Sequence, residues 1–457
     1  MKDTSARAPE RWRIRDGVVP KGRYIDPEFL ALEYERLFPR VWQMACRLEE
    51  IPNAGDFYEY EIGAESILVV NRGSGQLKAY FNSCPHRGTR LARGEGQLEE
   101  FTCPFHAWRF DLDGRCTYVH DVADFGPEFR LETVGLAECR VDTWGGWAFV
   151  HMDPEAESLA DWLAPLPDAL GPFALERMRF RWHKTAVMPA NWKSVIDAFI
   201  EGYHTGGRHP QMIRAARMDH GPATVEELAG SPYTPSESVG RHSHFTYGAR
   251  PASDDRPMPR AVDANDRKRV LLLTEYNASH LRALASESDV RAARRLQDVE
   301  LPEGQTAFEV FARLRREEAE ADGISWPTIS AEQFVAGQGN WHLFPTMVLL
   351  VEPGGALGYR VRPNGKDPNS SVFEAWSMEL CPDDAAPPCS HERFEHWQDH
   401  DDWGLLLPQD FENFPDVTAG MHSRAFRGLR LNPKQESGIL NAHVAADEFV
   451  FGDGEKS

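Results

Sequence analysis

Two short segments, each opened by Cys-Pro and each offering one cysteine and one histidine, constrain this chain more than any other feature. They are "CPHRG" at Cys84–Gly88 and "CPFHAW" at Cys103–Trp108, and together they give the spacing C-x-H-x16-C-x2-H. Two thiolates and two imidazoles are a ligand set for one tetrahedral zinc or for a two-iron cluster. Zinc fingers usually take paired ligands of one type from C-x2-4-C and H-x3-5-H units. Because each segment here offers one ligand of each type, the pattern favours two irons held between two loops.

Length and charge narrow the other possibilities. The chain has 457 residues, too many for one compact core, so we expect two domains. A formal net charge of -21 argues against a sequence-independent nucleic-acid binder, which needs a basic surface. No apolar run is long enough for a membrane span, and the segment "MKDTSARAPERWRIRDG" lacks the apolar core of a signal peptide. We therefore expect a cytoplasmic protein with neither a membrane nor a nucleic-acid partner.

The cysteines other than those of the two Cys-Pro segments predict no metal site of their own. Their number in the whole chain is odd, at 7, and the chain is long, which excludes a disulfide scaffold. Only Cys84 and Cys103 have metal-ligand spacing to histidines. The other five are expected to be small buried hydrophobic residues or free thiols: Cys46, Cys116, Cys139, Cys381 and Cys389.

Residues 45–155 are expected to form a small all-β domain that contains both Cys-Pro segments. Short β-rich runs such as "SILVV" and "LKAYF" are separated by Gly and Asn, and "WGGWAFVHMDP" adds a further strand and a turn. The preceding residues 1–44 are expected to be an N-terminal helical segment that packs on the catalytic domain. Its helix is predicted to begin at Asp26-Pro27, with Asp26 as the N-cap.

Residues 156–457 are expected to form an α+β domain, with an antiparallel sheet packed with helices. Three runs predict strands: "GNWHLFPTMVLLVEP", "GALGYRVRP" and "SVFEAWSMEL". An amphipathic helix is predicted over Thr306–Gly323, and "KQESGILNAHVAADEFVFG" predicts another. Residues 218–268, rich in Pro, Ser, Asp and Arg, predict an extended excursion.

A second group of candidate metal ligands lies in "NWKSVIDAFIEGYHTGGRHPQ" at Asn191–Gln211. Apolar residues recur there at helical spacing, and we expect Trp192, Val195, Ile196, Phe199 and Tyr203 to face the core. On the same helix, Asp197, Glu201 and His204 recur at i, i+4 and i+7 and form one polar stripe.

His209 lies five residues after His204, and five residues turn a regular helix by about 140°, so the two imidazoles would not face one point. Gly206-Gly207 lies between them and is expected to break or bulge the helix, which brings His209 back. Two imidazoles and one carboxylate on one face are the ligand set of non-haem Fe(II) oxygenases. The segment itself lacks that carboxylate unless Glu201 supplies it.

"NSCPHRGTRL" together with "FTCPFHAWRFDLDGRC" resembles the Rieske [2Fe–2S] signature. The resemblance implies that Cys84 and Cys103 bind one iron, while His86 and His106 bind the other through Nδ1. Imidazole donates less electron density than thiolate, so such a cluster accepts electrons at a higher potential than an all-cysteine one. Neither loop carries the extra cysteine that joins the loops in respiratory-chain Rieske proteins, which points to the oxygenase type.

From about Tyr24 to Phe451 the chain resembles the catalytic α subunits of Rieske non-haem iron oxygenases, the aromatic-ring-hydroxylating family. That resemblance implies a helix-grip, START-like catalytic domain. It also implies that a D/E-x2-H-x4-H segment supplies both histidine ligands of a mononuclear iron, here His204 and His209. The third ligand in the family is a distant aspartate, which Asp410 in "PQDFENFPDVTAGMHS" matches. Other histidines, including His342, His422 and His443, are expected to be structural.

The resemblance gives Glu201 a separate role. In the family, the acid at this position forms a hydrogen bond across a subunit interface to a cluster histidine of a neighbouring protomer, and so joins the two metal centres. It is most often Asp; Glu also occurs in the oxygenases of quaternary amines. Asp197 is expected either to tune the same hydrogen-bonded stripe or to be solvated. The implied assembly is a head-to-tail homotrimer, with or without a small β subunit.

These observations lead to one principal functional hypothesis and two alternatives. No G-x-G-x-x-G follows a strand, so electrons from NAD(P)H are expected to arrive through a separate reductase or ferredoxin. The principal hypothesis is a terminal oxygenase that uses O2 to hydroxylate a substrate. The apolar run "FPTMVLLV" favours a hydrophobic, aromatic substrate. The first alternative is a Rieske monooxygenase that performs O- or N-demethylation or oxidises a quaternary amine. The remote alternative is an electron-transfer Rieske protein without oxygenase activity.

Overall fold

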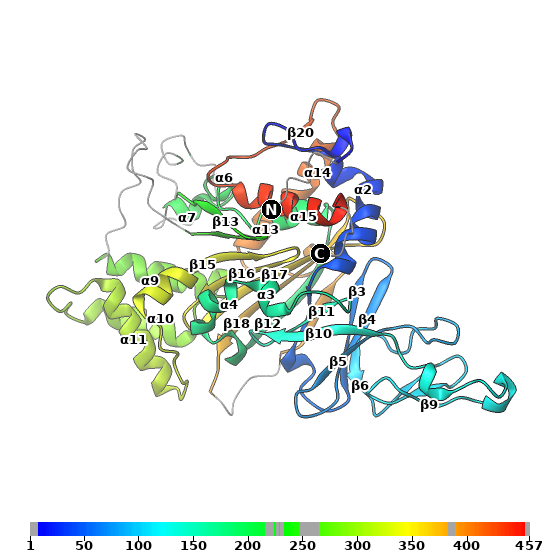
Figure 1. Cartoon of the computed structure of the whole chain (residues 1–457). Coiled ribbons are helices and arrows are strands. Elements are labelled where there is room, and N and C mark those ends of the chain that lie inside the picture. The colour runs from blue at the N-terminus through cyan, green and yellow to red at the C-terminus, as the bar shows by residue number, and fades with distance from the viewer. Residues whose placement is uncertain are drawn as a thin grey trace. The chain divides into compact units, whose positions relative to one another are not determined.

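The computed structural model describes residues 8–214, 224, 228, 233–246, 265–382 and 389–452. The chain divides into two compact units, shown within the whole chain in Figure 1. The small unit is Leu30–Pro167, and the large unit combines Met1–Phe29 with Asp168–Ser457. Residues 30–44 and 156–167 thus belong to the small unit, whereas the sequence assigned them to segments on either side of it. The expected boundaries at residues 44/45 and 155/156 stay a prediction.

The small unit is built on a seven-stranded antiparallel sheet with the order β2-β11-β10-β5-β4-β3-β6. Its strands are β2 (Gln43–Arg47), β3 (Asp56–Ile62), β4 (Glu65–Asn71), β5 (Leu77–Phe81), β6 (Glu95–Gln97), β10 (Glu138–Trp144) and β11 (Trp147–His151). A second sheet joins β7 (Phe101–Thr102), β8 (Arg109–Phe110) and β9 (Cys116–Tyr118). One Cys-Pro segment follows β5 and the other connects β7 to β8, so the predicted β-rich region around both segments is confirmed.

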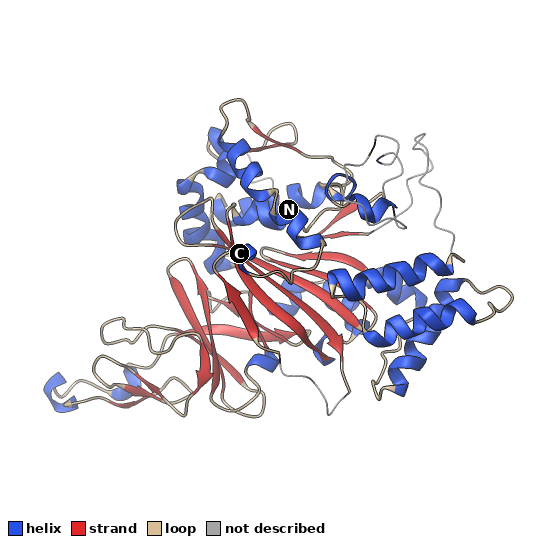
Figure 2. Cartoon of the chain, turned by 180° about the vertical axis from the view of Figure 1, so that it is seen from behind, coloured by secondary structure: helices blue, strands red, loops and turns tan. Residues whose placement is uncertain are grey.

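The large unit contains an eight-stranded sheet with the order β13-β14-β15-β16-β17-β18-β12-β19. Its strands are β12 (Met178–Met188), β13 (Ser236–Val239), β14 (His242–Phe245), β15 (Gly339–Leu343), β16 (Met347–Glu352), β17 (Gly355–Pro363), β18 (Ser371–Leu380) and β19 (His391–Phe394). All pairs are antiparallel except β12–β19, which is parallel. The predicted antiparallel sheet packed with helices is therefore confirmed (Figure 2). The parallel pair of β12 and β19 at its edge was not expected.

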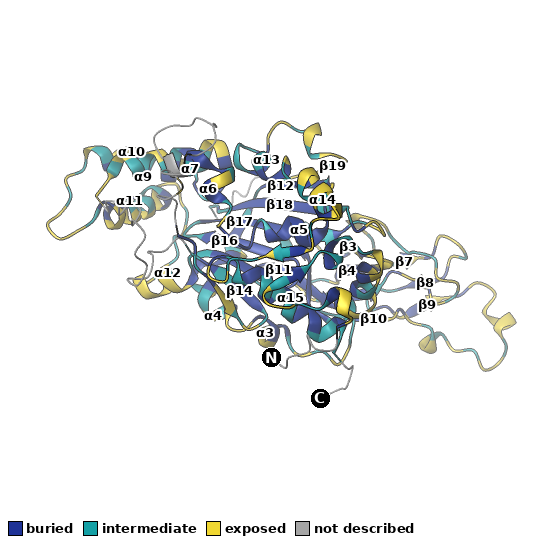
Figure 3. Ribbon diagram, turned by 90° about the horizontal axis from the view of Figure 1, so that it is seen from above, coloured by how far each residue is buried: buried dark blue, intermediate teal, exposed yellow. Residues whose placement is uncertain are grey.

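Helices and a short ribbon surround this sheet. The helices are α1 (Gly22–Ile25), α5 (Trp192–Asp197), α6 (Thr205–Arg208), α7 (Pro210–Arg214), α9 (Arg267–Tyr276), α10 (Glu287–Asp298), α11 (Ala307–Ala321), α12 (Ala331–Gly337), α13 (Leu406–Phe411), α14 (Phe414–His422) and α15 (Ser437–Val450). β1 (Val18–Pro20) pairs antiparallel with β20 (Gly428–Arg430). Strands β17 and β18 are almost entirely buried, as Figure 3 shows in dark blue.

Three further helices lie next to the boundaries between the units: α2 (Pro27–Leu32), α3 (Leu159–Leu163) and α4 (Leu166–Leu170). The backbone N–H of Glu28 donates to Asp26 Oδ1 at 3.0 Å, which confirms Asp26 as the cap of α2. The helix predicted over Thr306–Gly323 is also confirmed, because α11 begins after a capping box formed by Thr306 and Glu309. The predicted C-terminal helix is α15.

One expectation for the sheet was wrong. The run "GNWHLFPTMVLLVEP" is two antiparallel strands, β15 and β16, because Pro345 has no N–H for the ladder and lies in the turn between them. Within residues 218–268, the described part contains the hairpin of β13 and β14, closed by Gly240 at a φ of 61°. The rest of the expected excursion lies mostly outside the described residues.

Candidate metal centres

The two Cys-Pro segments form turns with the same backbone hydrogen bonds. The N–H of Cys84 donates to Thr89 O at 2.9 Å, and the N–H of Cys103 donates to Trp108 O at 2.8 Å. The carbonyls of the two cysteines accept from Gly88 N and Ala107 N at 2.8 and 3.0 Å. Gly88 and Ala107, the donors of these two hydrogen bonds, both have positive φ, at 76° and 55°. The repeated sequence pattern is therefore a repeated loop conformation that presents its cysteine and histidine alike.

The side chains of these loops fit a cluster held by two sulfurs and two imidazoles. Cys84 and Cys103 are both buried, at 2% exposure, and burial raises the pKa of the Cys84 thiol to about 11. The rings of His86 and His106 lie 4.6 Å apart between centroids, and His86 stacks on Trp108 at 4.7 Å. Nδ1 of each histidine is buried without a hydrogen-bond partner. An unpartnered buried ring nitrogen is costly in a protein, and a metal bond at each Nδ1 would satisfy it.

His204, His209 and Asp410, named here the His–His–Asp cluster, come together in the large unit. One ligand atom from each lies within 4.8 Å of the others. Asp410 Oδ1 is 3.1 Å from His209 Nε2 and 3.7 Å from His204 Nε2. His209 and Asp410 are buried, and His204 is partly buried. Two imidazoles and one carboxylate converging on one point form the ligand set of a mononuclear non-haem iron.

Each histidine of this cluster is held at Nδ1 by an acceptor outside the cluster. Glu201 Oε1 lies 2.6 Å from His204 Nδ1, and Gln409 Oε1 lies 2.8 Å from His209 Nδ1. With Nδ1–H donated to these oxygens, the Nε2 lone pairs point to the cluster, as metal-binding histidines require. Burial opposes a positive charge on His204, but Glu201 and Asp410 outweigh it and raise the pKa of His204 to about 9. The site therefore favours positive charge at this ring, which a bound cation supplies as well as a proton does.

The helix expected over residues 192–204 is interrupted. Helix α5 ends at Asp197, and the carboxylate of Glu201 accepts hydrogen bonds from the backbone N–H groups of Tyr203 and His204. These N–H groups are therefore withdrawn from an α-helical ladder. The break falls at residues 198–204, and Gly206-Gly207, expected to be the break, lie inside α6. Tyr203 is 56% exposed and does not face the core as predicted.

Asp197 and Glu201 nevertheless share one cavity. This cavity of about 280 Å³, named here the Glu201 groove, is lined by both acids, by Glu436 and Arg430, and by apolar side chains of α14, α15 and the segment between them. Asp197 is buried, and the hydroxyl of Tyr24 donates to its Oδ2 at 2.7 Å. Burial raises the pKa of Asp197 to about 7. Asp197 thus makes a hydrogen bond within the large unit while it also lines the groove, and whether it tunes Glu201 stays a prediction.

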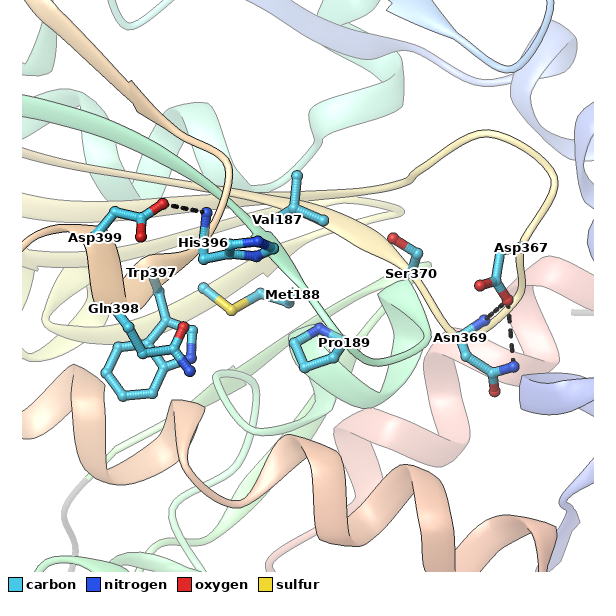
Figure 4. Close-up of a pocket in the computed structure, with 10 residues that line it drawn as sticks. All are labelled: Val187, Met188, Pro189, Asp367, Asn369, Ser370, His396, Trp397, Gln398 and Asp399. Carbon is cyan, nitrogen blue, oxygen red and sulfur yellow. Dashed lines mark hydrogen bonds between the residues drawn. The ribbon is translucent and has the colours of Figure 1, made fainter.

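A larger cavity of about 470 Å³ lies at the end of β12, beside the β17–β18 turn and residues 396–399 (Figure 4). None of the site residues predicted from the sequence lines it. The sequence also missed Gln409 as the acceptor that holds His209, and it gave no sign of the contact between His443 Nε2 and the Tyr24 hydroxyl, which lie 2.7 Å apart. The position of Gln409 next to Asp410 was the signal for the first; nothing local signalled the second.

A β-rich unit with two equivalent Cys/His loops, joined in one chain to an α+β unit with the His–His–Asp cluster, defines the class of Rieske non-haem iron proteins. The chain belongs to the family of ring-hydroxylating α subunits, whose catalytic-domain model matches residues 175–450, and the Rieske [2Fe–2S] domain model matches residues 41–131. Its cofactors are a Rieske [2Fe–2S] cluster and a mononuclear non-haem iron. Among the described residues, no helix is long and apolar enough to cross a membrane.

Several curated relatives are similar over part of their length. The glycine betaine monooxygenase oxygenase subunit of Chromohalobacter salexigens is 34% identical over 206 residues, which are 45% of this chain and 46% of the relative. The carnitine monooxygenase oxygenase subunit of Escherichia coli K12 is 33% identical over 221 residues, 47% of this chain and 56% of the relative. The anthranilate 1,2-dioxygenase large subunit of Acinetobacter baylyi is 33% identical over 228 residues, 46% and 48% of the two chains. The chain spans about half the length of the curated relatives it matches.

Solved structures share the fold over nearly the whole chain. A quaternary ammonium Rieske monooxygenase in complex with L-carnitine has a TM-score of 0.62 at 17% identity, covering 98% of this chain and 99% of that one. Naphthalene 1,2-dioxygenase from a Rhodococcus species, bound to indole, has a TM-score of 0.62 at 19% identity, covering 96% of each chain. At these identities the likeness shows the fold alone.

Proposed function

We propose that the chain is the terminal oxygenase subunit of a multicomponent system that oxidises a quaternary ammonium compound or a related amine with O2. Electrons come from NAD(P)H through a separate reductase, with or without a ferredoxin. The observation that carries this proposal is the His–His–Asp cluster with a glutamate, Glu201, holding His204. Two groups of relatives, named for glycine betaine and carnitine, support the amine substrate over the aromatic one expected from the sequence.

We assign Cys84, Cys103, His86 and His106 as the cluster ligands and His204, His209 and Asp410 as the iron ligands. When bound, the cluster supplies single electrons and the iron supplies O2 activation beside the substrate. Residues of the chain itself orient the two histidine rings for metal binding. Glu201 and Gln409 hold the Nδ1 protons of His204 and His209, so that the Nε2 atoms are the ring nitrogens directed toward the metal. Asp410 lies between the two rings and completes the ligand set with a negative charge.

The assembly we propose is a head-to-tail homotrimer in which the Cys/His loops of one subunit enter the Glu201 groove of the next. Two features support complementary surfaces. The loops carry exposed Phe105, over which Arg87 lies at 5.0 Å from the ring, while the groove is lined by Asp197, Glu201 and Glu436 with apolar walls. Basic and aromatic groups are suited to such an acidic, apolar recess. Glu201 then reaches the partner subunit's His106.

The cytoplasm is the proposed location, because NAD(P)H-dependent electron supply and reduced thiols are found there. Whether a small β subunit joins the trimer is decided by light scattering on the protein purified from its source cells. A mass equal to three chains excludes the β subunit.

The test of function begins with composition. Fully loaded protein is expected to contain iron and acid-labile sulfide near three to two; a ratio of two to two means that no mononuclear iron binds. Oxygen uptake is then measured with a surrogate reductase on glycine betaine, carnitine and other methylated amines, with formaldehyde assayed as the product of N-demethylation. Substrate-dependent uptake with matching product supports the proposal. A protein that takes up and passes on electrons but consumes no O2 with any substrate is an electron carrier.

A second candidate is dihydroxylation of an aromatic acid, which the anthranilate dioxygenase relative favours. The same oxygen-uptake screen includes anthranilate and related arenes. Coupled consumption of O2 with an arene, and none with methylated amines, replaces the first proposal with the second.

A further inference from the structure

Asp197, Tyr24 and His443 form a hydrogen-bonded chain in the interior of the large unit. The Tyr24 hydroxyl lies 2.7 Å from Asp197 Oδ2 and 2.7 Å from His443 Nε2. All three side chains are buried, at 9%, 0% and 3% exposure. They come from three separate elements, α5, α1 and α15, so the chain is a product of tertiary structure.

A phenol has one proton, so Tyr24 can donate to only one of its two neighbours. In one arrangement Asp197 is ionised, Tyr24 donates to it, and His443 donates its Nε2–H to the phenol oxygen. In the other, Asp197 is protonated and donates to the phenol oxygen, and Tyr24 donates to an unprotonated His443 Nε2. The arrangements differ by one proton on Asp197 and by the tautomer of His443.

In both arrangements each hydrogen between the three groups has an acceptor, so the hydrogen-bonded chain can adopt either one. His443 stays neutral in each, because burial lowers its pKa well below the ordinary value, assisted by the charges of Arg23 and Lys193. The pKa of Asp197 lies near neutral pH. Burial and the charges of Glu201 and Glu436 raise its pKa to about 7, against the hydrogen bond of Tyr24 and the charge of Lys193.

Asp197 brings the hydrogen-bonded chain of three side chains close to Glu201, the acid that contacts His204. Asp197 and Glu201 line the same groove, with Glu436 and Arg430 as the other ionisable side chains of its lining. Glu201 in turn contacts His204 at 2.6 Å. A change of charge along Glu201 and His204 therefore acts directly on the carboxyl of Asp197.

We propose that Asp197, Tyr24 and His443 form a proton-accepting chain beside Glu201, which takes up one proton as an electron passes through the Glu201 groove. This inference rests on the proposed function for the source of the electron. The cluster that Cys84, Cys103, His86 and His106 would hold would supply the electron, and the iron that the His–His–Asp cluster would hold would receive it. One proton from water forms an O–H bond on Asp197, and the proton of His443 moves from Nε2 to Nδ1. Charge added near Glu201 is thereby compensated.

The proton can follow the chain of hydrogen bonds. It adds to Nδ1 of His443, the Nε2 proton passes to Tyr24, and the phenolic proton passes to Asp197. Direct entry at Asp197 from the groove, with tautomerisation of His443, gives the same final arrangement. Asp197 holds the proton in this scheme and is a positioning residue. Among the described residues, its side-chain hydrogen bond is to Tyr24 and not to the His–His–Asp cluster.

The first test is infrared spectroscopy of the isolated holoprotein, without turnover. Wild-type protein is expected to show the C=O band of a buried carboxylic acid at pH 6 that disappears with a midpoint near pH 7. Asp197→Asn removes the band. Tyr24→Phe retains the band but shifts its midpoint to higher pH, because the carboxylate loses its donor. Tyr60→Phe, which removes a buried hydroxyl bound to Gln43 at 3.0 Å in the small unit, is the matched control and leaves the titration unchanged.

The second test is proton uptake on reduction, followed with a pH indicator at pH 8, where Asp197 starts ionised. Wild-type protein is expected to take up about one proton per chain more than Asp197→Asn. Tyr24→Phe is expected to lose most of that difference, because loss of the Tyr24 donor raises the pKa of Asp197 and leaves it largely protonated at pH 8 before reduction. Equal uptake by wild type and Asp197→Asn, or a titration that Tyr24→Phe does not move, overturns the inference. The infrared titration needs no substrate, so it measures the protonation of Asp197 even in a protein without oxygenase activity. An active oxygenase in which no carboxyl titrates rejects this inference and leaves the proposed function standing.

Discussion

Gln409 should control how tightly the chain holds its mononuclear iron, although it is not one of the proposed ligands. Its Oε1 accepts from His209 Nδ1 at 2.8 Å and from Gln211 Nε2 at 2.7 Å. Gln409→Ala removes the acceptor that fixes both the tautomer and the orientation of the His209 ring. Loss of such an outer partner typically weakens metal binding by about 10- to 100-fold. That corresponds to about 1.4–2.8 kcal/mol.

The assay uses the Rieske cluster as an internal standard. Protein is dialysed against graded concentrations of an Fe(II) chelator, and the iron that remains beyond the cluster is divided by the Rieske absorbance. Gln409→Ala should lose mononuclear iron at a chelator concentration about 10- to 100-fold lower than wild type. Gln409→Glu keeps an acceptor oxygen and should retain iron at least as well.

Gln211→Ala is the matched control, because Gln211 contacts the Gln409 amide while the bond from His209 to Gln409 is left in place. Its iron retention should stay close to wild type. If Gln409→Ala holds iron as tightly as Gln211→Ala, the reasoning that this amide orients His209 is refuted.

Alanine at any one residue of the His–His–Asp cluster should abolish turnover and leave the visible Rieske spectrum intact, because the two proposed centres use different ligands in different units. If Asp410→Ala remains active, Asp410 is not the third ligand, and Asp197 or Glu201 becomes the suspected one. Glu201→Gln should leave both metal centres loaded but slow electron transfer between subunits, seen in single-turnover experiments as substrate binding with little product, and a fully active monomer would contradict this. Asp447→Ala should destabilise the protein by about 3–5 kcal/mol in denaturant unfolding, because the buried Arg23 guanidinium, 2.8 Å from Asp447, loses its partner. The exposed pair of Arg295 with Glu317 supplies the control: Glu317→Ala should cost no more than about 1 kcal/mol, and equal losses would refute the burial argument.

The parts of the molecule that the sequence predicts well are those set by local chemistry. The two Cys-Pro loops are defined within six residues each by their own backbone hydrogen bonds, and a left-handed position at Gly88 is readable in the sequence. The cap at Asp26 is similarly local. Such features depend on neighbours along the chain, so spacing alone indicates them.

The remaining features depend on competition or on distant contacts. Helical periodicity over residues 192–204 was misleading, because the Glu201 carboxylate takes backbone N–H groups that the helix would use. Asp410 was predicted from the family pattern and not from the residues, since about 200 positions separate it from His209 and no local rule links them. The hydrogen bonds from Tyr24 to Asp197 and His443 were not foreseeable, because they join three elements that only the folded large unit brings together.

The interruption of the large unit by the small one sets an order of events during synthesis on the ribosome. Arg23 and Asp447, which close the large unit by a buried ion pair, are 424 residues apart, so at about 5–20 residues per second the first waits on the order of 20–85 s for the second. The small unit is contiguous and has left the ribosome long before that, free to fold and to receive its cluster from the assembly machinery. The His–His–Asp cluster cannot form until Asp410 has emerged, so iron binding there has to follow the synthesis of the whole small unit.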